Sequence, residues 1–251
     1  MEIMEFSLLK ALIIFLVTAI VTFVGASTGG IGMFVIPLFI FLGFPVPMAV
    51  ATTRVGALAS MAGGLIGFSK YKKIDYKIGV KGSLFACVGA YIGSSLLLLI
   101  PVDLAKKFIA IIMIFLLCFS FLKKKSISIN FQISIFKKVI GYFLFFITGC
   151  VSGAFGGQGI LLVYTLTLFF GMDLITAAGT RAVISLCITV MALIVYFKAD
   201  TICWSYGVVD AIASLIGTYF GAIYSVKKGE GLIEKIFEIM IVLILIKLLC
   251  F

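Results

Sequence analysis

Apolar segments follow one another along the whole of the 251-residue chain and are separated by short polar stretches. A helix of roughly 20 residues crosses the roughly 30 Å hydrocarbon core of a bilayer, and several of these segments approach or exceed that length. The pattern therefore predicts an all-α polytopic membrane protein. We assign about five helical segments to each half of the chain: residues 7–24, 31–43, 46–69, 78–100 and 104–122, followed by 138–155, 160–171, 173–197, 207–226 and 232–251.

The two halves of the chain repeat the same motifs in the same order. Thr53-Arg54 of the first half recurs as Thr180-Arg181, and Gly89 recurs as Gly217, with a single position inserted between the two matches in the second copy. Matches in one order and at nearly constant spacing indicate an internal duplication. We therefore divide the chain into three parts: a first transmembrane repeat at residues 1–122, a basic cytoplasmic linker at 123–137 and a second transmembrane repeat at 138–251.

The second segment of each half, at residues 31–43 and 160–171, is too short to cross the bilayer alone. A dozen helical residues rise only about 18 Å. We therefore expect the first two segments of each half to form a broken or re-entrant helical hairpin. The glycine-rich turn of each hairpin must be shielded from lipid, because unpaired backbone groups are not tolerated there.

Lysine-rich loops predict the orientation of the two repeats. The loop at residues 69–77 and the stretch at 123–138 are both rich in lysine, and two spans separate them, so both can face the cytoplasm. The loop at 198–206, which corresponds to 69–77, has one lysine and one aspartate and is expected on the opposite side. The repeats are therefore expected to have inverted topology, which places a binding site at their interface near the middle of the membrane.

Composition excludes several classes of function. The chain is 63% hydrophobic and 12% charged, with a net charge of +10 and no histidine. We attribute the positive charge to lysines that set the topology, so we expect no nucleic-acid partner. The six cysteines are scattered singly through apolar runs, so with no histidine available we expect neither a metal site nor a cofactor. No nucleophile lies beside a suitable base, so we do not expect an enzyme.

Arg54 and Arg181 are the only arginines in the chain and occupy equivalent positions in the two repeats. Each lies about eight residues into its apolar segment, or about 12 Å along a helix. An unpaired charge at that depth costs at least several kcal/mol, so something must compensate it. One interpretation is structural, with each arginine bound to helix-end carbonyls of the neighbouring hairpin, snorkelling, or paired with an acid. The other is an oxyanion site, which suits the planar fork of guanidinium donors.

A glycine-rich turn precedes the short second helix of each repeat, at Gly29-Gly30-Ile31-Gly32 and Gly156-Gly157-Gln158-Gly159. Exposed N–H groups and the positive end of the helix dipole at such a turn could face an anion. Tight helix packing through small residues is the alternative, and it is the interpretation we favour for Gly63-Gly64, Gly89 and Gly93. Gln158 replaces the apolar residue of the first copy and could either donate to a ligand or cap a helix.

Few acidic residues are available to carry a proton. Asp173, Asp210, Glu234 and Glu238 are predicted at or just inside the ends of apolar segments, where most carboxylates face water. The sequence therefore leaves proton coupling open.

These motifs resemble the TauE/SafE sulfite exporter family. The resemblance rests on Gly-Ala-Ser-Thr-Gly-Gly-Ile-Gly at residues 25–32 with Ala-Thr-Thr-Arg at 51–54, and on Gly-Ala-Phe-Gly-Gly-Gln-Gly at 153–159 with Ala-Gly-Thr-Arg at 178–181. It extends over about residues 7–250. It implies a multi-pass transporter of the plasma membrane that moves sulfite or organic sulfonates, commonly outward.

We therefore expect a secondary transporter of small anions, sulfite or organosulfonates, that works by alternating access in the lipid bilayer. There are two alternatives. One is an anion channel that uses the arginines for selectivity, and the other is a non-transporting membrane scaffold subunit in which the arginines pack helices. A homodimer is left open. The residues expected to bind the substrate are Arg54, Arg181, Thr53, Thr180, Gly29, Gly30, Gly32, Gly156, Gly157, Gln158 and Gly159.

Overall fold

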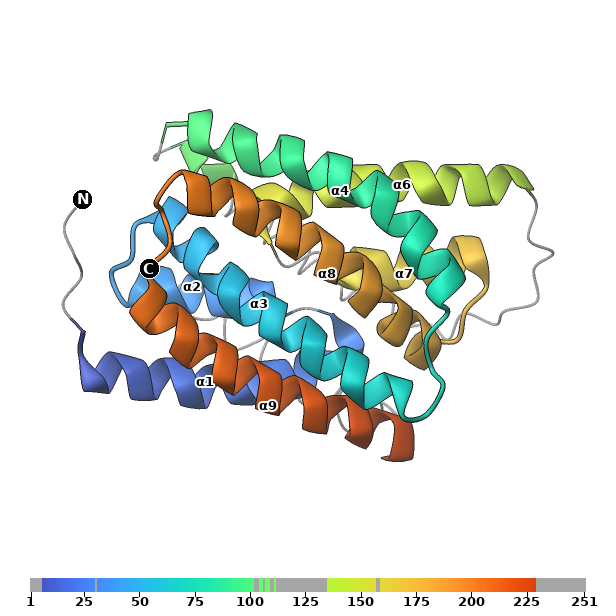
Figure 1. The fold of residues 1–251 in the computed structure, drawn as a ribbon, viewed down its shortest axis with the longest axis horizontal. Coiled ribbons are helices and arrows are strands. Elements are labelled where there is room, and N and C mark those ends of the chain that lie inside the picture. The colour runs from blue at the N-terminus through green and yellow to red at the C-terminus, as the bar shows by residue number, and fades with distance from the viewer. Residues whose placement is uncertain are drawn as a thin grey trace.

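The computed structural model describes residues 6–29, 31–101, 104–105, 107–108, 111, 135–156 and 159–228. Its described elements are all helices, as predicted (Figure 1). The predicted segment 232–251 lies outside the described residues, as do most of segment 104–122 and most of the linker. The helices are α1 (Leu8–Thr28), α2 (Gly32–Phe41), α3 (Val46–Ser69), α4 (Tyr76–Leu99), α6 (Ile135–Phe155), α7 (Gly159–Phe170), α8 (Leu174–Lys198) and α9 (Trp204–Lys228).

Within the described residues, six helices are long and apolar enough to cross a membrane: α1, α3, α4, α6, α8 and α9. The remaining two, α2 and α7, have 10 and 12 residues. They rise only about 15 and 18 Å, so neither crosses a bilayer alone, as the sequence predicted. Helices α1 and α6, which precede them, each have 21 residues and are long enough to span. The chain is therefore a multi-pass helical membrane protein.

Two aspartates define where long helices begin. The Asp75 carboxylate accepts a hydrogen bond from the backbone N–H of Ile78 at the start of α4, and Asp173 accepts one from Thr176 at the start of α8. Both are N-caps that satisfy free backbone donors. Partial burial acts to raise the pKa of Asp173, but the hydrogen bonds from Thr176 and the charge of Lys73, 3.7 Å away, bring it below its ordinary value. Asp173 is exposed beyond the helix end, as expected.

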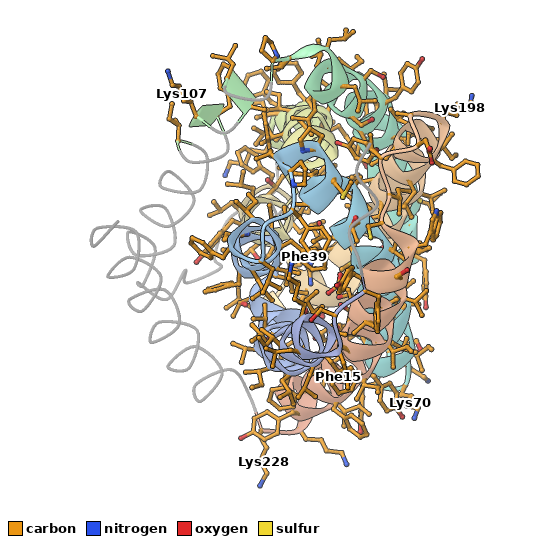
Figure 2. All side chains as sticks on the ribbon, turned by 90° about the vertical axis from the view of Figure 1, so that its left-hand side faces the viewer. Phe15, Phe39, Lys70, Lys107, Lys198 and Lys228 are labelled. Carbon is orange, nitrogen blue, oxygen red and sulfur yellow. The ribbon has the colours of Figure 1, made fainter. Side chains whose placement is uncertain are left out.

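The main helix contacts come in two matching sets. Helix α3 packs against α9 as α8 packs against α4, and α4 packs against α6 as α9 packs against α1. In Figure 1, α4 and α6 lie along one edge of the bundle, α1 and α9 lie along the other, and α3 and α8 run between them. Figure 2 shows the labelled lysines pointing outward, whereas Phe39 is enclosed and fully buried. Large apolar side chains such as Leu8, Leu84 and Val208 are exposed on the outer faces, as contact with lipid requires.

Glycines allow the closest of these helix contacts. A Cβ added at Gly89 or Gly93 of α4 would overlap the carbonyl oxygens of Phe146 or Cys150 on α6. Gly217 and Gly221 of α9 lie in the same way against Ala19 and Phe23 of α1. The packing role that we favoured for Gly89 and Gly93 is confirmed, and Gly63 likewise approaches the backbone of α9 at Leu215.

Candidate functional site

The two glycine turns lie against each other. Gly29, after the end of α1, has φ +84°, and Gly156, after the end of α6, has φ +72°, both in the left-handed region that favours glycine. A Cβ at Gly29 would lie 2.6 Å from the carbonyl carbon of Gly159 at the start of α7. The broken helix of each half therefore reaches the broken helix of the other. Three predicted site residues of these turns, Gly30, Gly157 and Gln158, lie outside the described residues.

Each arginine binds the helix end of the opposite half. Arg54 on α3 donates from Nη2 to the carbonyl of Ser152 near the end of α6, at 2.5 Å, and Arg181 on α8 donates from Nη2 to the carbonyl of Ala26 near the end of α1, at 3.0 Å. The carbonyls at a helix C-terminus carry partial negative charge, which partly compensates a buried cation. This is one of the structural interpretations drawn from the sequence.

These bonds leave much of each guanidinium without a partner. Both side chains are buried, with 4% of Arg54 and 3% of Arg181 exposed, and Nε of each has no hydrogen-bond partner in the described structure. No carboxylate among the described residues forms an ion pair with either arginine, so neither is neutralised by one of those residues. A guanidinium has five N–H donors, and leaving charged donors unpaired in a membrane protein is costly. A small anion would satisfy them.

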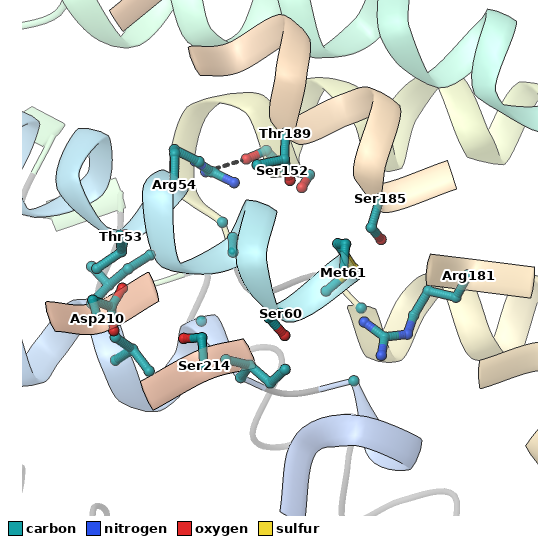
Figure 3. Close-up of a pocket in the computed structure, with 18 residues that line it drawn as sticks. Thr53, Arg54, Ser60, Met61, Ser152, Arg181, Ser185, Thr189, Asp210 and Ser214 are labelled. Carbon is teal, nitrogen blue, oxygen red and sulfur yellow. Dashed lines mark hydrogen bonds between the residues drawn. The ribbon is translucent and has the colours of Figure 1, made fainter. Parts of the chain in front are cut away.

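A cavity of about 70 Å³ lies between the two arginines. Figure 3 shows Arg54 and Arg181 on opposite sides of it, with Ser60 and Met61 of α3 between them. A single water needs about 10–15 Å³, so the space suits a few atoms the size of those in a small oxyanion. The cavity is lined by seven of the predicted site residues: Gly29, Gly32, Thr53, Arg54, Gly156, Gly159 and Arg181.

Thr180 is not among the residues that line the cavity. Its side chain is fully buried, and its hydroxyl accepts a hydrogen bond from the backbone N–H of Asp75 at 2.9 Å. Thr53, its counterpart, does line the cavity, and its hydroxyl donates to the carbonyl of Val50. The two threonines therefore occupy different surroundings although their motifs match.

Hydroxyl groups that we did not single out from the sequence complete the lining. Ser185 and Thr189 follow Arg181 by four and eight residues on α8, so they share its helix face. A search of the sequence for polar residues at helical spacing from each arginine would have identified Ser185 and Thr189. The other polar lining residues beyond the predicted set are Ser60, Ser152, Asp210 and Ser214.

The expectation that Asp210 faces water at a segment end is wrong. Its side chain is 1% exposed and lines the cavity, and its Oδ1 accepts a hydrogen bond from the hydroxyl of Thr18 at 2.9 Å. The reason is that α9 begins at Trp204, before the predicted start at residue 207. Asp210 therefore lies about 9 Å along the helix and faces inward.

Comparison with known proteins points to one family. The family model described as "Sulfite exporter TauE/SafE" matches residues 14–248. The chain is 22% identical over 250 residues to "Probable membrane transporter protein ORF9" of Sinorhizobium sp., covering 99% of this chain and 95% of the relative. It is 26% identical over 239 residues to a "Probable membrane transporter protein" of Haemophilus influenzae, covering 91% and 90%. It is 27% identical over 225 residues to "Probable membrane transporter protein YdhB" of Bacillus subtilis, covering 86% and 89%. No solved structure matches the chain.

Proposed function

Since the chain belongs to the TauE/SafE sulfite exporter family, whose relatives above are named as membrane transporters, we propose that it carries small anions across the plasma membrane by alternating access. The proposed cargo is sulfite or an organic sulfonate. The observation that carries this proposal is the pair of buried arginines at one cavity, each with an Nε that has no hydrogen-bond partner among the described residues. An oxyanion with several acceptor oxygens can receive hydrogen bonds from such donors.

The proposed mechanism requires two repeats of inverted topology. The helix bounds support a repeat, because α1 (Leu8–Thr28) and α6 (Ile135–Phe155) begin and end at equivalent positions of the two copies. The reciprocal arginine contacts support it as well, because each repeat supplies the cation that binds the broken helix of the other. The difference in lysine content between the loops at 69–77 and 198–206 supports the inversion. Rocking of one repeat against the other would then open the cavity to each side in turn.

The bonds from the arginines to helix-end carbonyls are also what a packing role would produce. A scaffold protein in which the arginines only hold helix ends is therefore the competing function. The two functions differ in one respect: in a scaffold protein the cavity binds no transported anion.

Counterflow of isotope-labelled sulfite in proteoliposomes separates these functions. Vesicles loaded with unlabelled sulfite are diluted into a trace of labelled sulfite, and the label inside is followed with time. A carrier exchanges one for the other, so we expect a transient accumulation of label above its equilibrium level. An anion channel would show no such overshoot when the membrane potential is clamped to zero, and a scaffold would behave like protein-free vesicles. Either of those results would overturn the proposal.

A further inference from the structure

Asp210 is the one acidic side chain among the described residues that line the cavity. It is 1% exposed, and the hydroxyl of Thr18 on α1 is the partner of its Oδ1. Its Oδ2 occupies the space that a side chain at position 56 of α3 would fill, so the glycine at that position makes room for the carboxylate. Buried carboxylates in membrane helices are rare and costly, and they mark ion or proton pathways.

The charged groups around Asp210 are few. Arg54 of α3 and Arg181 of α8 are the other charged residues of the cavity lining, and Figure 3 shows the carboxylate apart from both. From α1 the neighbouring group is the neutral Thr18, and on α9 itself the nearest titratable group is Tyr206, one turn earlier, whose hydroxyl accepts a hydrogen bond from the backbone of Ser7. The described lining residues of α2, α6 and α7 carry no charge.

The corresponding position of the first half has no carboxylate. When the two repeats are aligned on their shared motifs, Gly82 corresponds to Asp210 and Phe145 corresponds to Thr18. A Cβ at Gly82 would lie 3.0 Å from Phe145 and from Ile184, so apolar side chains fill the equivalent space there. A carboxylate that is present at only one of two corresponding packing positions is better explained by function than by packing.

We propose that Asp210 is a proton-binding site that couples anion transport to the co-transport of a proton, an inference that rests on the anion transport proposed above. An anion held by the arginines and an ionised Asp210 repel each other in one small cavity, where all three side chains are buried. Anion binding therefore favours a proton on Asp210, and that proton in turn favours the anion. The two ligands enter and leave the cavity together, so the cycle is a symport. The only covalent bond that forms and breaks in this cycle is the O–H bond of the Asp210 carboxyl group.

The test compares the wild-type protein with Asp210→Asn in sulfite-loaded proteoliposomes. In wild type, a pH gradient that is acidic outside should drive labelled sulfite inward above its equilibrium level. In Asp210→Asn, exchange at equal pH on both sides should remain measurable, whereas accumulation driven by the pH gradient should be lost. The ionisation of sulfite itself is the same in both experiments, so the difference reports on the protein. Ser225→Ala, a buried polar change on α9 outside the cavity lining, should keep the gradient-driven accumulation.

A second measurement keeps the inference testable if Asp210→Asn folds poorly. Sulfite affinity of the wild-type protein should fall with rising pH by up to about tenfold per pH unit. Thr18→Val removes a hydrogen bond that stabilises the ionised carboxylate, so this fall should move to higher pH. Gradient-driven accumulation in Asp210→Asn, or an unchanged pH profile in Thr18→Val, would overturn the proton site. Absence of sulfite exchange in wild type would instead overturn the proposed function, and the inference with it.

Discussion

Replacing either Arg54 or Arg181 with glutamine is expected to weaken sulfite binding by roughly 10- to 150-fold and to reduce counterflow accordingly. A hydrogen bond to a charged group contributes about 1.5–3 kcal/mol, and 1.4 kcal/mol corresponds to a factor of ten in affinity. Glutamine keeps an amide donor but is two bonds shorter than arginine, so it does not extend to the position from which Nη2 donates to the carbonyl of Ser152 or Ala26. It removes the charge and the Nε donor, which has no partner within the described part of the chain.

The control for this prediction is Lys198→Gln, which removes one positive charge from the exposed end of α8 and leaves the cavity lining unchanged. Its sulfite affinity should stay close to that of wild type. Arg54→Lys should fall between the wild type and Arg54→Gln, because lysine keeps the charge but not the planar set of donors. Wild-type affinity in both glutamine variants, combined with a lower unfolding temperature, would assign the arginines to packing alone.

Replacing Gly29 with alanine is expected to destabilise the protein by about 3 kcal/mol and to impair sulfite binding. The left-handed backbone costs a non-glycine residue about 1–2 kcal/mol. The added Cβ also overlaps the backbone of Gly159, which cannot move aside by changing a rotamer, and such overpacking costs about 1–3 kcal/mol more. The two glycine turns would be pushed apart at the site where both halves contribute to the cavity.

Gly43→Ala provides a matched control for this effect. Gly43 has φ +92°, and a Cβ added there would meet nothing within 4 Å. Both variants place an alanine in left-handed backbone, which lowers the free energy of unfolding of each by a similar amount. The difference between their free energies of unfolding therefore isolates the contact between the turns. Equal destabilisation of the two variants would show that the close approach of Gly29 to Gly159 contributes nothing.

The sequence was sufficient to predict the features that depend on local pattern. Apolar length gave the helices and the two short segments, and the small residues Gly89 and Gly93 were correctly assigned to helix packing, because these properties can be read along a single helix. The matched Thr-Arg motifs placed both arginines deep in equivalent helices, and the cavity is lined by both.

Long-range contacts could not be predicted in the same way. The burial of Asp210 depends on where α9 begins and on the packing of α1 and α3 around it, which involves residues such as Thr18 that are 192 positions away. Thr180 faces the start of α4 at Asp75 instead of the cavity, although its motif matches that of Thr53. The choice of carbonyl for each guanidinium is likewise a contact between the two halves.

We propose that the cavity between Arg54 and Arg181 binds a small oxyanion. An experimental structure of the protein soaked with selenite, a heavier analogue of sulfite, tests it most directly through the anomalous signal of selenium. We predict selenium in the cavity, with its oxygens accepting hydrogen bonds from Nε of at least one of the two arginines. An empty cavity at a saturating concentration, or both Nε groups bonded to protein atoms with selenium bound elsewhere, would contradict the account.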